Sequence, residues 1–238
     1  MVDGKVALVT GGSRGIGQAI ARALLNGGAR VAITATSEET LRKGADELTS
    51  TVNTASLLPI TADVRRHADV VRATETVAHH FGGIDILVNN AGVGVFRSVT
   101  DMAIEDWHKI IDTNLTGVFY FCQAALPHLR ARGGGWIINI SSLSGKHPFA
   151  EAAGYCASKA ALNAFSEALM QEVRHDGIRV AYVMPGSVRT GFNRSVGNDD
   201  WKLAPDDVAQ VVIDLLSYPS RSLPSAVEIR SSQPPRKG

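Results

Sequence analysis

The chain has 238 residues, of which 45% are hydrophobic and 20% charged, and its formal net charge is +1. This composition excludes a disordered chain, a collagen and a long coiled coil. The near-neutral charge offers no strong field to nucleic acid or to an anionic membrane, so neither is expected as a partner.

The cysteines indicate the compartment. There are only two cysteines, Cys122 and Cys156, which excludes a disulfide scaffold, and they form no C-x-x-C metal or redox pair. So few thiols fit a reducing environment. The N-terminus shows no signal sequence, and no uninterrupted run of about 18 apolar residues predicts a membrane helix. We therefore expect a cytoplasmic protein without a bound metal.

Apolar runs alternate with amphipathic stretches along the first half of the chain. The apolar runs predict strands at residues 5–10, 31–36, 57–60 and 84–88. The 3.6-residue periodicity predicts helices at residues 15–26, after a cap at Ser37, and at residues 69–81. Pro59 is unfavourable inside a central strand.

The second half repeats the alternation. It predicts a long helix at residues 104–130, in which Pro127 marks a kink or a boundary near the end. Three further strands are predicted at residues 136–140, 178–184 and 226–229, and two further helices at residues 153–175 and 207–217.

This alternation predicts an α/β fold. Parallel strands joined by right-handed crossovers form a doubly wound, Rossmann-like sheet with helices on both faces. Residues 1–238 form a single domain in this interpretation, because no linker interrupts the pattern. Such sheets bind ligands beyond the carboxyl ends of their strands. The aperiodic segment 186–204 is a candidate substrate loop, and the polar segment 231–238 is expected to be a loose tail.

A glycine-rich turn joins the first strand to the first helix. It reads Thr10-Gly11-Gly12-Ser13-Arg14-Gly15-Ile16-Gly17. Glycines allow a sharp turn and a close approach to a phosphate, and a helix N-terminus attracts a pyrophosphate. A glycine pattern alone also fits a plain turn, but its position between strand and helix favours a dinucleotide.

The spacing Gly11, Gly15, Gly17 resembles that of the short-chain dehydrogenase/reductase family. The resemblance extends to Asn89-Asn90-Ala91-Gly92, to Asn114, Ser142, Tyr155 and Lys159, and to Pro185-Gly186 with Thr190. It implies hydride transfer between a nicotinamide and a carbonyl or secondary alcohol, with the tetrad Asn114, Ser142, Tyr155 and Lys159 as the catalytic residues. It also implies that these residues hold the cofactor: Gly11, Ser13, Arg14, Gly15, Ile16, Gly17, Thr36, Ser37, Asp63, Val64, Asn90, Ala91, Gly92, Tyr155, Lys159, Pro185, Gly186, Val188 and Thr190.

Tyr155 and Lys159 are four residues apart, so on a helix they share a face. A tyrosine with an ordinary pKa near 10 is a poor base at neutral pH. An ammonium about 5 Å away contributes roughly 3 kcal/mol to a phenolate at an effective dielectric constant of about 20. We therefore expect Lys159 to lower the pKa of Tyr155, helped by the cationic oxidised nicotinamide. A surface tyrosine beside a solvated lysine is the alternative.

Ser142 and Asn114 complete the tetrad that the resemblance implies. Ser142 follows a strand, where its hydroxyl can stabilise charge on a carbonyl oxygen, and no G-x-S-x-G elbow favours a covalent role. Ser141 and Ser144 are its neighbours. Asn114 lies inside the long helix, where the resemblance implies a local kink whose carbonyl holds a water near Lys159; a satisfied polar residue is the alternative.

The second strand indicates the cofactor. An acid that binds the ribose is typical of NAD enzymes at this place, but the chain reads Thr34-Ala35-Thr36-Ser37. Arg14, Thr36 and Ser37 can meet a 2′-phosphate, so NADP is predicted over NAD. A solvated surface charge is the alternative role for Arg14.

The substrate is less determined. Expected pocket residues are Val93, Ser144, His147, Phe149 and Phe192, and Arg189 and Arg194 are candidates for binding an anion. The N-terminal half resembles 3-oxoacyl-acyl-carrier reductases, which makes 3-oxoacyl or related ketones plausible substrates, but the C-terminus departs from them. A small hydroxy-acid or serine dehydrogenase, a broad carbonyl reductase and a catalytically silent NADP-sensing module stay open. The resemblance implies a homotetramer or homodimer.

Overall fold

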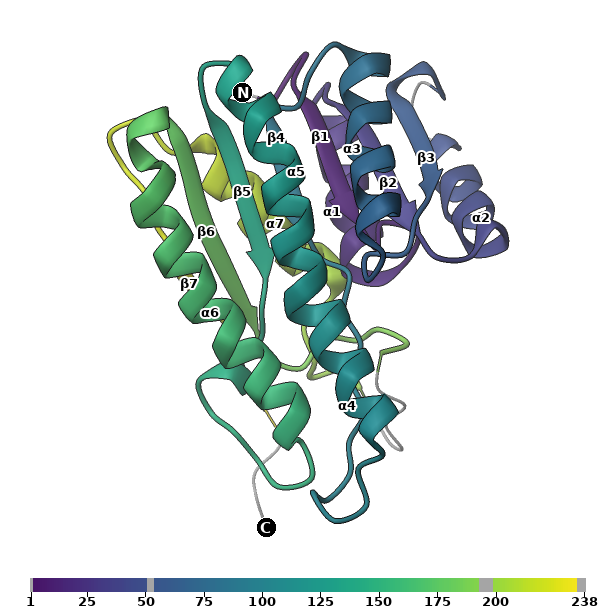
Figure 1. The fold of residues 1–238 in the computed structure, drawn as a ribbon, viewed down its shortest axis with the longest axis vertical. Helices are drawn as coiled ribbons and strands as arrows, with labels where there is room; N and C mark the ends of the chain where they lie inside the picture. The colour runs from purple at the N-terminus through teal and green to yellow at the C-terminus, as the bar shows by residue number, and fades with distance from the viewer. Residues whose placement is uncertain (1, 51–53, 193–198, 235–238) are drawn as a thin grey trace.

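Seven parallel strands form one sheet in the computed structural model, which describes residues 2–50, 54–192 and 199–234 (Figure 1). The strand order is β3-β2-β1-β4-β5-β6-β7. The strands are β1 Val6–Thr10, β2 Arg30–Ala35, β3 Leu57–Thr61, β4 Ile86–Asn89, β5 Gly135–Ile140, β6 Ile178–Pro185 and β7 Ala226–Ile229. The predicted doubly wound α/β fold is confirmed, because the order reverses direction between β1 and β4.

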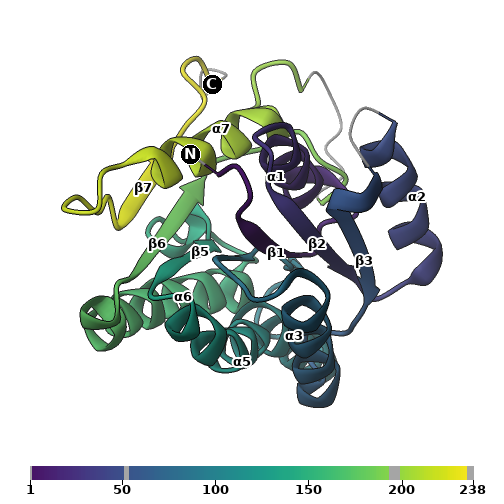
Figure 2. The same cartoon turned by 90° about the horizontal axis from the view of Figure 1, so that it is seen from above.

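Helices cover both faces of the sheet (Figure 2). One face carries α1 Gly15–Asn26, α2 Glu38–Thr49 and α7 Pro205–Ser217, and the other carries α3 His67–Phe81, α5 Gly117–Ala131 and α6 Ala153–Val173. Successive residues of β1 alternate between the two cores: Ala7 and Val9 pack with α1 and α7, and Val6 and Leu8 with α3 and α5. Burial on both faces explains why the central strands are continuous apolar runs.

Most predicted boundaries agree with the structure to within one or two residues. Ser37 caps α2, as predicted, because its hydroxyl accepts a hydrogen bond from the Thr40 N–H at 3.4 Å. Pro59 is tolerated because β3 lies at the edge of the sheet and the proline side chain is exposed.

The prediction of one uninterrupted helix at residues 104–130 is wrong for the middle of that range. The helix α4 Ile104–Ile111 is followed by a π-helical turn at Asp112–Thr116 before α5 begins. Pro127 lies inside α5, which continues to Ala131, so the helix does not end at the proline. The distortion instead occurs at Asn114, where the resemblance implies a kink.

The irregular segment after β6 contacts the start of the C-terminal tail. The segment after β6 is closed by a bridge between Val188 and Leu203, and residues 193–198 lie outside the described part of the chain. The expected tail is held at its first residue, because the Ser231 hydroxyl donates a hydrogen bond to the carbonyl of Trp201. Its last four residues, 235–238, are not described either.

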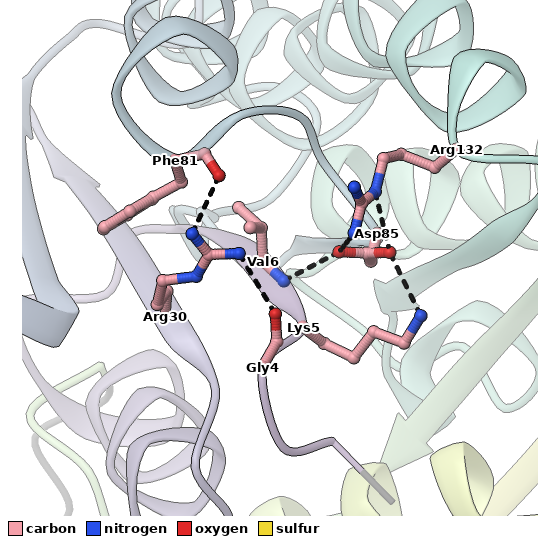
Figure 3. A network of polar contacts seen from close by, with 7 residues as sticks. All are labelled: Gly4, Lys5, Val6, Arg30, Phe81, Asp85 and Arg132. Atoms are coloured by element: carbon pink, nitrogen blue, oxygen red, sulfur yellow. Dashed lines mark hydrogen bonds and ion pairs between the residues drawn. The ribbon is translucent and has the colours of Figure 1, made fainter.

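The amino edge of the sheet is held by a polar network around Asp85 (Figure 3). The Asp85 carboxylate accepts hydrogen bonds from the Val6 N–H at 2.9 Å and from Lys5 and Arg132 at 3.2 Å. Arg30 donates to the carbonyls of Gly4 and Phe81. Within the described residues, no helix combines the length and hydrophobicity needed to cross a membrane.

Candidate active site

A cleft of about 930 Å³ lies at the carboxyl edge of the sheet, where the strands meet their loops. Most of the predicted site residues line it: Gly11, Ser13, Arg14, Gly15, Ile16, Thr36, Ser37, Asp63, Val64, Asn90, Ala91, Gly92, Ser142, Tyr155, Lys159, Pro185, Gly186, Val188 and Thr190. Gly17 and Asn114 do not line it, so any role they have in binding or catalysis is exerted through other residues.

The glycine turn is built for close backbone approach. Gly11 has a φ of +63°, and a Cβ there would lie 2.9 Å from the Cα of Ala91. A Cβ on Gly17 would lie 2.3 Å from the carbonyl oxygen of Gly11. The Asn90 amide donates to the carbonyls of Thr10 and Gly11 at 3.0 and 3.1 Å, which ties the loop after β4 to this turn. Larger residues at these glycines would fill the cradle and separate the two loops.

The first turn of α1 is open to an anion. Arg14 precedes the helix in an extended conformation, and no side chain caps the helix N-terminus. Within the described residues the Arg14 side chain is exposed and makes no ion pair. A pyrophosphate would meet both the free N–H groups and the positive end of the helix.

The end of β2 carries hydroxyls and no carboxylate. Thr34, Ala35, Thr36 and Ser37 all line the cleft. The Thr34 hydroxyl is fully buried and has no hydrogen-bond partner among the described residues. An unpartnered buried hydroxyl is costly; with no accessible surface, this atom does not itself offer a contact to a ligand. These features fit the adenosine half of a dinucleotide.

Ser142, Tyr155 and Lys159 meet at the centre of the cleft. Ser142 follows β5, and the other two residues lie one turn apart on α6. The Lys159 ammonium lies 5.9 Å from the centre of the Tyr155 ring and donates to the carbonyl of Ile140 at 2.9 Å. Ser142 exchanges hydrogen bonds with Ser144 at 3.1 Å. The hydroxyl of the neighbouring Ser141 instead donates a hydrogen bond to the Asn163 side chain at 2.5 Å.

Burial controls the protonation of this group. It lowers the pKa of Lys159 to about 8. It raises the pKa of Tyr155 above the ordinary value, against the opposing effect of the Ser142 hydroxyl. The expected lowering of the Tyr155 pKa by Lys159 is therefore wrong for the chain by itself. The reason is that the half-buried phenolate loses more hydration than its polar neighbours return.

Asn114 joins the loop after β4 to α6. Its side-chain oxygen accepts from the Val93 N–H at 2.8 Å, and its amide donates to the Val93 carbonyl at 2.9 Å and to Ser158 at 3.0 Å. Ser158 in turn donates to the backbone carbonyl of Tyr155 at 2.7 Å. Asn114 thus positions the helix turn that carries Tyr155, and the water relay that the resemblance implies stays a prediction.

The other end of the cleft is lined by the expected pocket residues Val93, Ser144, His147, Phe149 and Phe192. Arg189 does not line it and lies 3.6 Å from Asp200, and Arg194 is outside the described residues. Sequence reasoning missed Phe96 and Arg230, which also line this end. Phe96 could have been found because it lies in the loop after β4; Arg230 had no such signal, since the end of β7 reaches the site only in the folded sheet.

A sequence model of the family described as short chain dehydrogenase matches residues 5–201. The chain belongs to this family. An oxidoreductase of Staphylococcus epidermidis is 36% identical over 230 residues, which cover 96% of this chain and 98% of that protein. The chain is accordingly an oxidoreductase of the short-chain dehydrogenase type.

Solved structures of other short-chain dehydrogenases are similar throughout. A metagenomic short-chain oxidoreductase in complex with NADP is 36% identical, with a TM-score of 0.85 and coverage of 98% of this chain and 99% of that one. A 3-ketoacyl-(acyl-carrier-protein) reductase of Brucella melitensis, in complex with NADH, is 28% identical with a TM-score of 0.88, covering 98% and 99%. Both nicotinamide cofactors therefore occur among structural neighbours of this chain.

Proposed function

We propose that this short-chain dehydrogenase uses NADP to interconvert a ketone and a secondary alcohol. The observation that carries the proposal is the arrangement of one cleft. A glycine turn and an open helix N-terminus line one end, and Ser142, Tyr155 and Lys159 line its centre. Hydride transfer needs both parts, a cradle for a dinucleotide and a proton donor beside the carbonyl oxygen.

The chain's own residues perform the proton chemistry. When bound, the nicotinamide supplies the hydride for reduction or accepts it in oxidation. Tyr155 gives its hydroxyl proton to the carbonyl oxygen, and Ser142 donates a hydrogen bond to the same oxygen as negative charge develops there. Lys159 presents its ammonium beside the phenol, and the glycine turn, Asp63, Val64 and the loop at Asn90–Gly92 hold the dinucleotide.

The preference for NADP is supported by the end of β2. Ala35 leaves no carboxylate to bind the ribose or to repel a 2′-phosphate. The exposed Arg14 guanidinium and the hydroxyls of Thr36 and Ser37 line the same part of the cleft. Charge-assisted hydrogen bonds from such groups are typical of phosphate binding.

The first test measures oxidation of NADPH and, separately, of NADH against a panel of ketones that includes acetoacetyl thioesters. NADPH should support turnover, and Tyr155→Phe should lower kcat by about 10³-fold while the Kd for NADPH changes little. Tyr218→Phe is the matched control, because Tyr218 is exposed and does not line the cleft. Near-normal turnover by Tyr155→Phe would refute the mechanism. Tryptophan quenching by NADPH without turnover of any ketone would favour a sensing module.

The second test concerns Ala35. Ala35→Asp places a carboxylate where the 2′-phosphate is proposed to lie, so the ratio of kcat/KM with NADPH to that with NADH should fall by about tenfold or more. An unchanged ratio would refute the proposed position of the phosphate. The measurement uses one ketone at several cofactor concentrations.

Assembly and location are also proposals. Trp107 on α4 and Phe119 on α5 are 39% and 43% exposed, which supports a homodimer or homotetramer built through these helices. Light scattering of the purified protein tests this directly. The cytoplasmic location is supported by Cys122 and Cys156, which are buried and unpaired.

A further inference from the structure

We infer that the substrate end of the cleft selects an uncharged ketone that carries an aromatic ring. The inference rests on the proposed function, because it takes Tyr155 as the group that faces the carbonyl oxygen. It adds the chemical class of the substrate, which neither the family nor the tetrad determines.

An arc of aromatic rings surrounds the Tyr155 phenol. Phe96 meets its ring edge-on with 5.6 Å between centroids, and Phe192 lies 5.8 Å away. Phe149 stacks on Phe96 with 6.1 Å between centroids and 25° between planes. All of these side chains line the cleft. They come from the loops after β4, β5 and β6, so the arc exists only at the carboxyl edge of the folded sheet.

A glycine brings the rings together. A Cβ on Gly94 would lie 3.0 Å from ring carbons of both Phe96 and Phe192. A side chain at this position would press on both rings. Because Gly94 has no side chain, both phenylalanine rings can pack against the backbone of the loop after β4 and lie close to each other.

Much of this aromatic surface is uncovered. Phe149 is 52% exposed and Phe192 is 44% exposed. Single exposed apolar residues are common on soluble proteins. These two belong to one ring cluster that contains the proposed proton donor, and a flat apolar ligand would cover them with a favourable free energy.

Arg230, which lines this end of the cleft, and Lys146, which binds the same carboxylate as Arg230, already have partners. Arg230 lies 2.7 Å from the Glu228 carboxylate and 3.0 Å from the His147 ring. Lys146 pairs with the same carboxylate at 2.5 Å. A carboxylate substrate would have to compete with Glu228 for these cations, whereas an uncharged ring leaves the network intact.

The experiment compares three ketones with NADPH: 4′-methylacetophenone, which has a ring; 4-acetylbenzoate, which has a ring and a carboxylate; and butanone, which has neither. Phe149→Ala and Phe192→Ala remove one ring each. Tyr218→Ala is the control, because Tyr218 is exposed to a similar extent but does not line the cleft. The intrinsic reactivity of each ketone is the same for every variant, so a change in the ratio of kcat/KM values reports the protein.

The wild-type chain should prefer 4′-methylacetophenone to the other two ketones. Phe192→Ala should lower the ratio of kcat/KM for 4′-methylacetophenone to that for butanone by about tenfold, and Phe149→Ala should lower it in the same direction. Tyr218→Ala should leave this ratio unchanged. A ratio that neither cleft variant alters would overturn the inference. A preference for 4-acetylbenzoate would also overturn it and assign recognition to Arg230.

Calorimetry separates this inference from the proposed function. Titration of 4′-methylacetophenone into the protein saturated with NADP⁺ needs no turnover. If no ketone is reduced but the aromatic ketone binds, with about tenfold weaker affinity in Phe192→Ala, the reductase proposal fails and the aromatic site stands. If ketones are reduced but the aromatic ketone neither binds nor turns over, the reductase stands and the aromatic site fails.

Discussion

At the scale of the residue, the site is organised around a phenol and an amine that are both partly or wholly removed from water. Burial raises the pKa of Tyr155 above its ordinary value, so the phenol holds its proton at neutral pH, as the proposed donation to a carbonyl oxygen requires. Lys159 is 5% exposed, and its ammonium is bound to the Ile140 carbonyl. In the proposed mechanism, oxidation of an alcohol needs the phenolate, so its rate should increase as the pH rises.

The buried amine gives a pH-dependent stability. The pKa of Lys159 is about 8 in the folded chain and near 10.4 in the unfolded chain. Between these values the unfolded state binds more protons, so stability rises with pH. Lys159→Met removes the buried charge and should raise the free energy of unfolding below pH 8 by up to about 3 kcal/mol, an advantage that fades toward pH 10.

Urea unfolding of wild type and Lys159→Met at pH 7 and at pH 10 measures this difference in the absence of cofactor. Subtracting the two proteins cancels the titration of the other tyrosines and lysines. An equal difference at both pH values would show that Lys159 keeps an ordinary pKa. Loss of turnover by the same variant would show that function retains a destabilising charge.

At the scale of the element, the Asn114 side chain positions helix α6, and the Asp85 side chain connects segments at the amino edge of the sheet. The π-helical turn between α4 and α5 lets Asn114 reach Val93 and Ser158, and so aligns the loop after β4 with α6. At the opposite edge, Asp85 joins the start of β1 to Arg132 beyond α5 (Figure 3).

Asp85→Asn tests the polar network around Asp85. Burial raises the Asp85 pKa, but hydrogen bonds from Val6, Arg132 and Lys5 outweigh it, and the net pKa lies below the ordinary value. The stabilisation is thus present above the unfolded pKa near 3.9 and is lost as the pH falls through the lower folded pKa. At pH 7 the substitution should cost about 1–2 kcal/mol, because charged hydrogen bonds become neutral ones.

Urea midpoints of wild type and Asp85→Asn at pH 7 and below pH 4 check this prediction. The gap between the two proteins should narrow at the acidic pH. Asp176→Asn is the control, since its ion pair with Arg130 is more exposed and should contribute about 0.5 kcal/mol or less. If Asp85→Asn lowers the stability to urea no more than Asp176→Asn does, the network does not stabilise the amino edge of the sheet.

At the scale of the whole molecule, binding of a dinucleotide would connect the two halves of the sheet. The cleft receives residues from the loops after β1, β2 and β3 on one side and after β4, β5 and β6 on the other. A ligand that contacts both halves binds only the folded chain, and it stabilises that chain by about 2.7 kcal/mol at 100 times its Kd.

Thermal unfolding with each cofactor tests this coupling. NADPH should raise the Tm more than NADH at equal concentration, and Arg14→Ala should reduce the NADPH shift to about that of NADH. Arg22→Ala, on the same helix but outside the cleft, should keep both shifts. Equal shifts for the two cofactors in wild type would contradict the assignment of Arg14 to the 2′-phosphate.

The amino-acid sequence by itself determined the order and type of most elements and named the strand-end residues that line the proposed cofactor half of the cleft. Buried parallel strands are continuous apolar runs, and the proposed cofactor residues follow strand ends within a few positions, so both are local patterns. Only the tertiary structure decided the interrupted helix at Asp112–Thr116, the arrival of Arg230 at the cleft, and the ring arc that includes Phe96. It also decided the direction of the Tyr155 pKa shift. These features depend on packing between distant segments and on the loss of hydration in the assembled cleft, which no local spacing encodes.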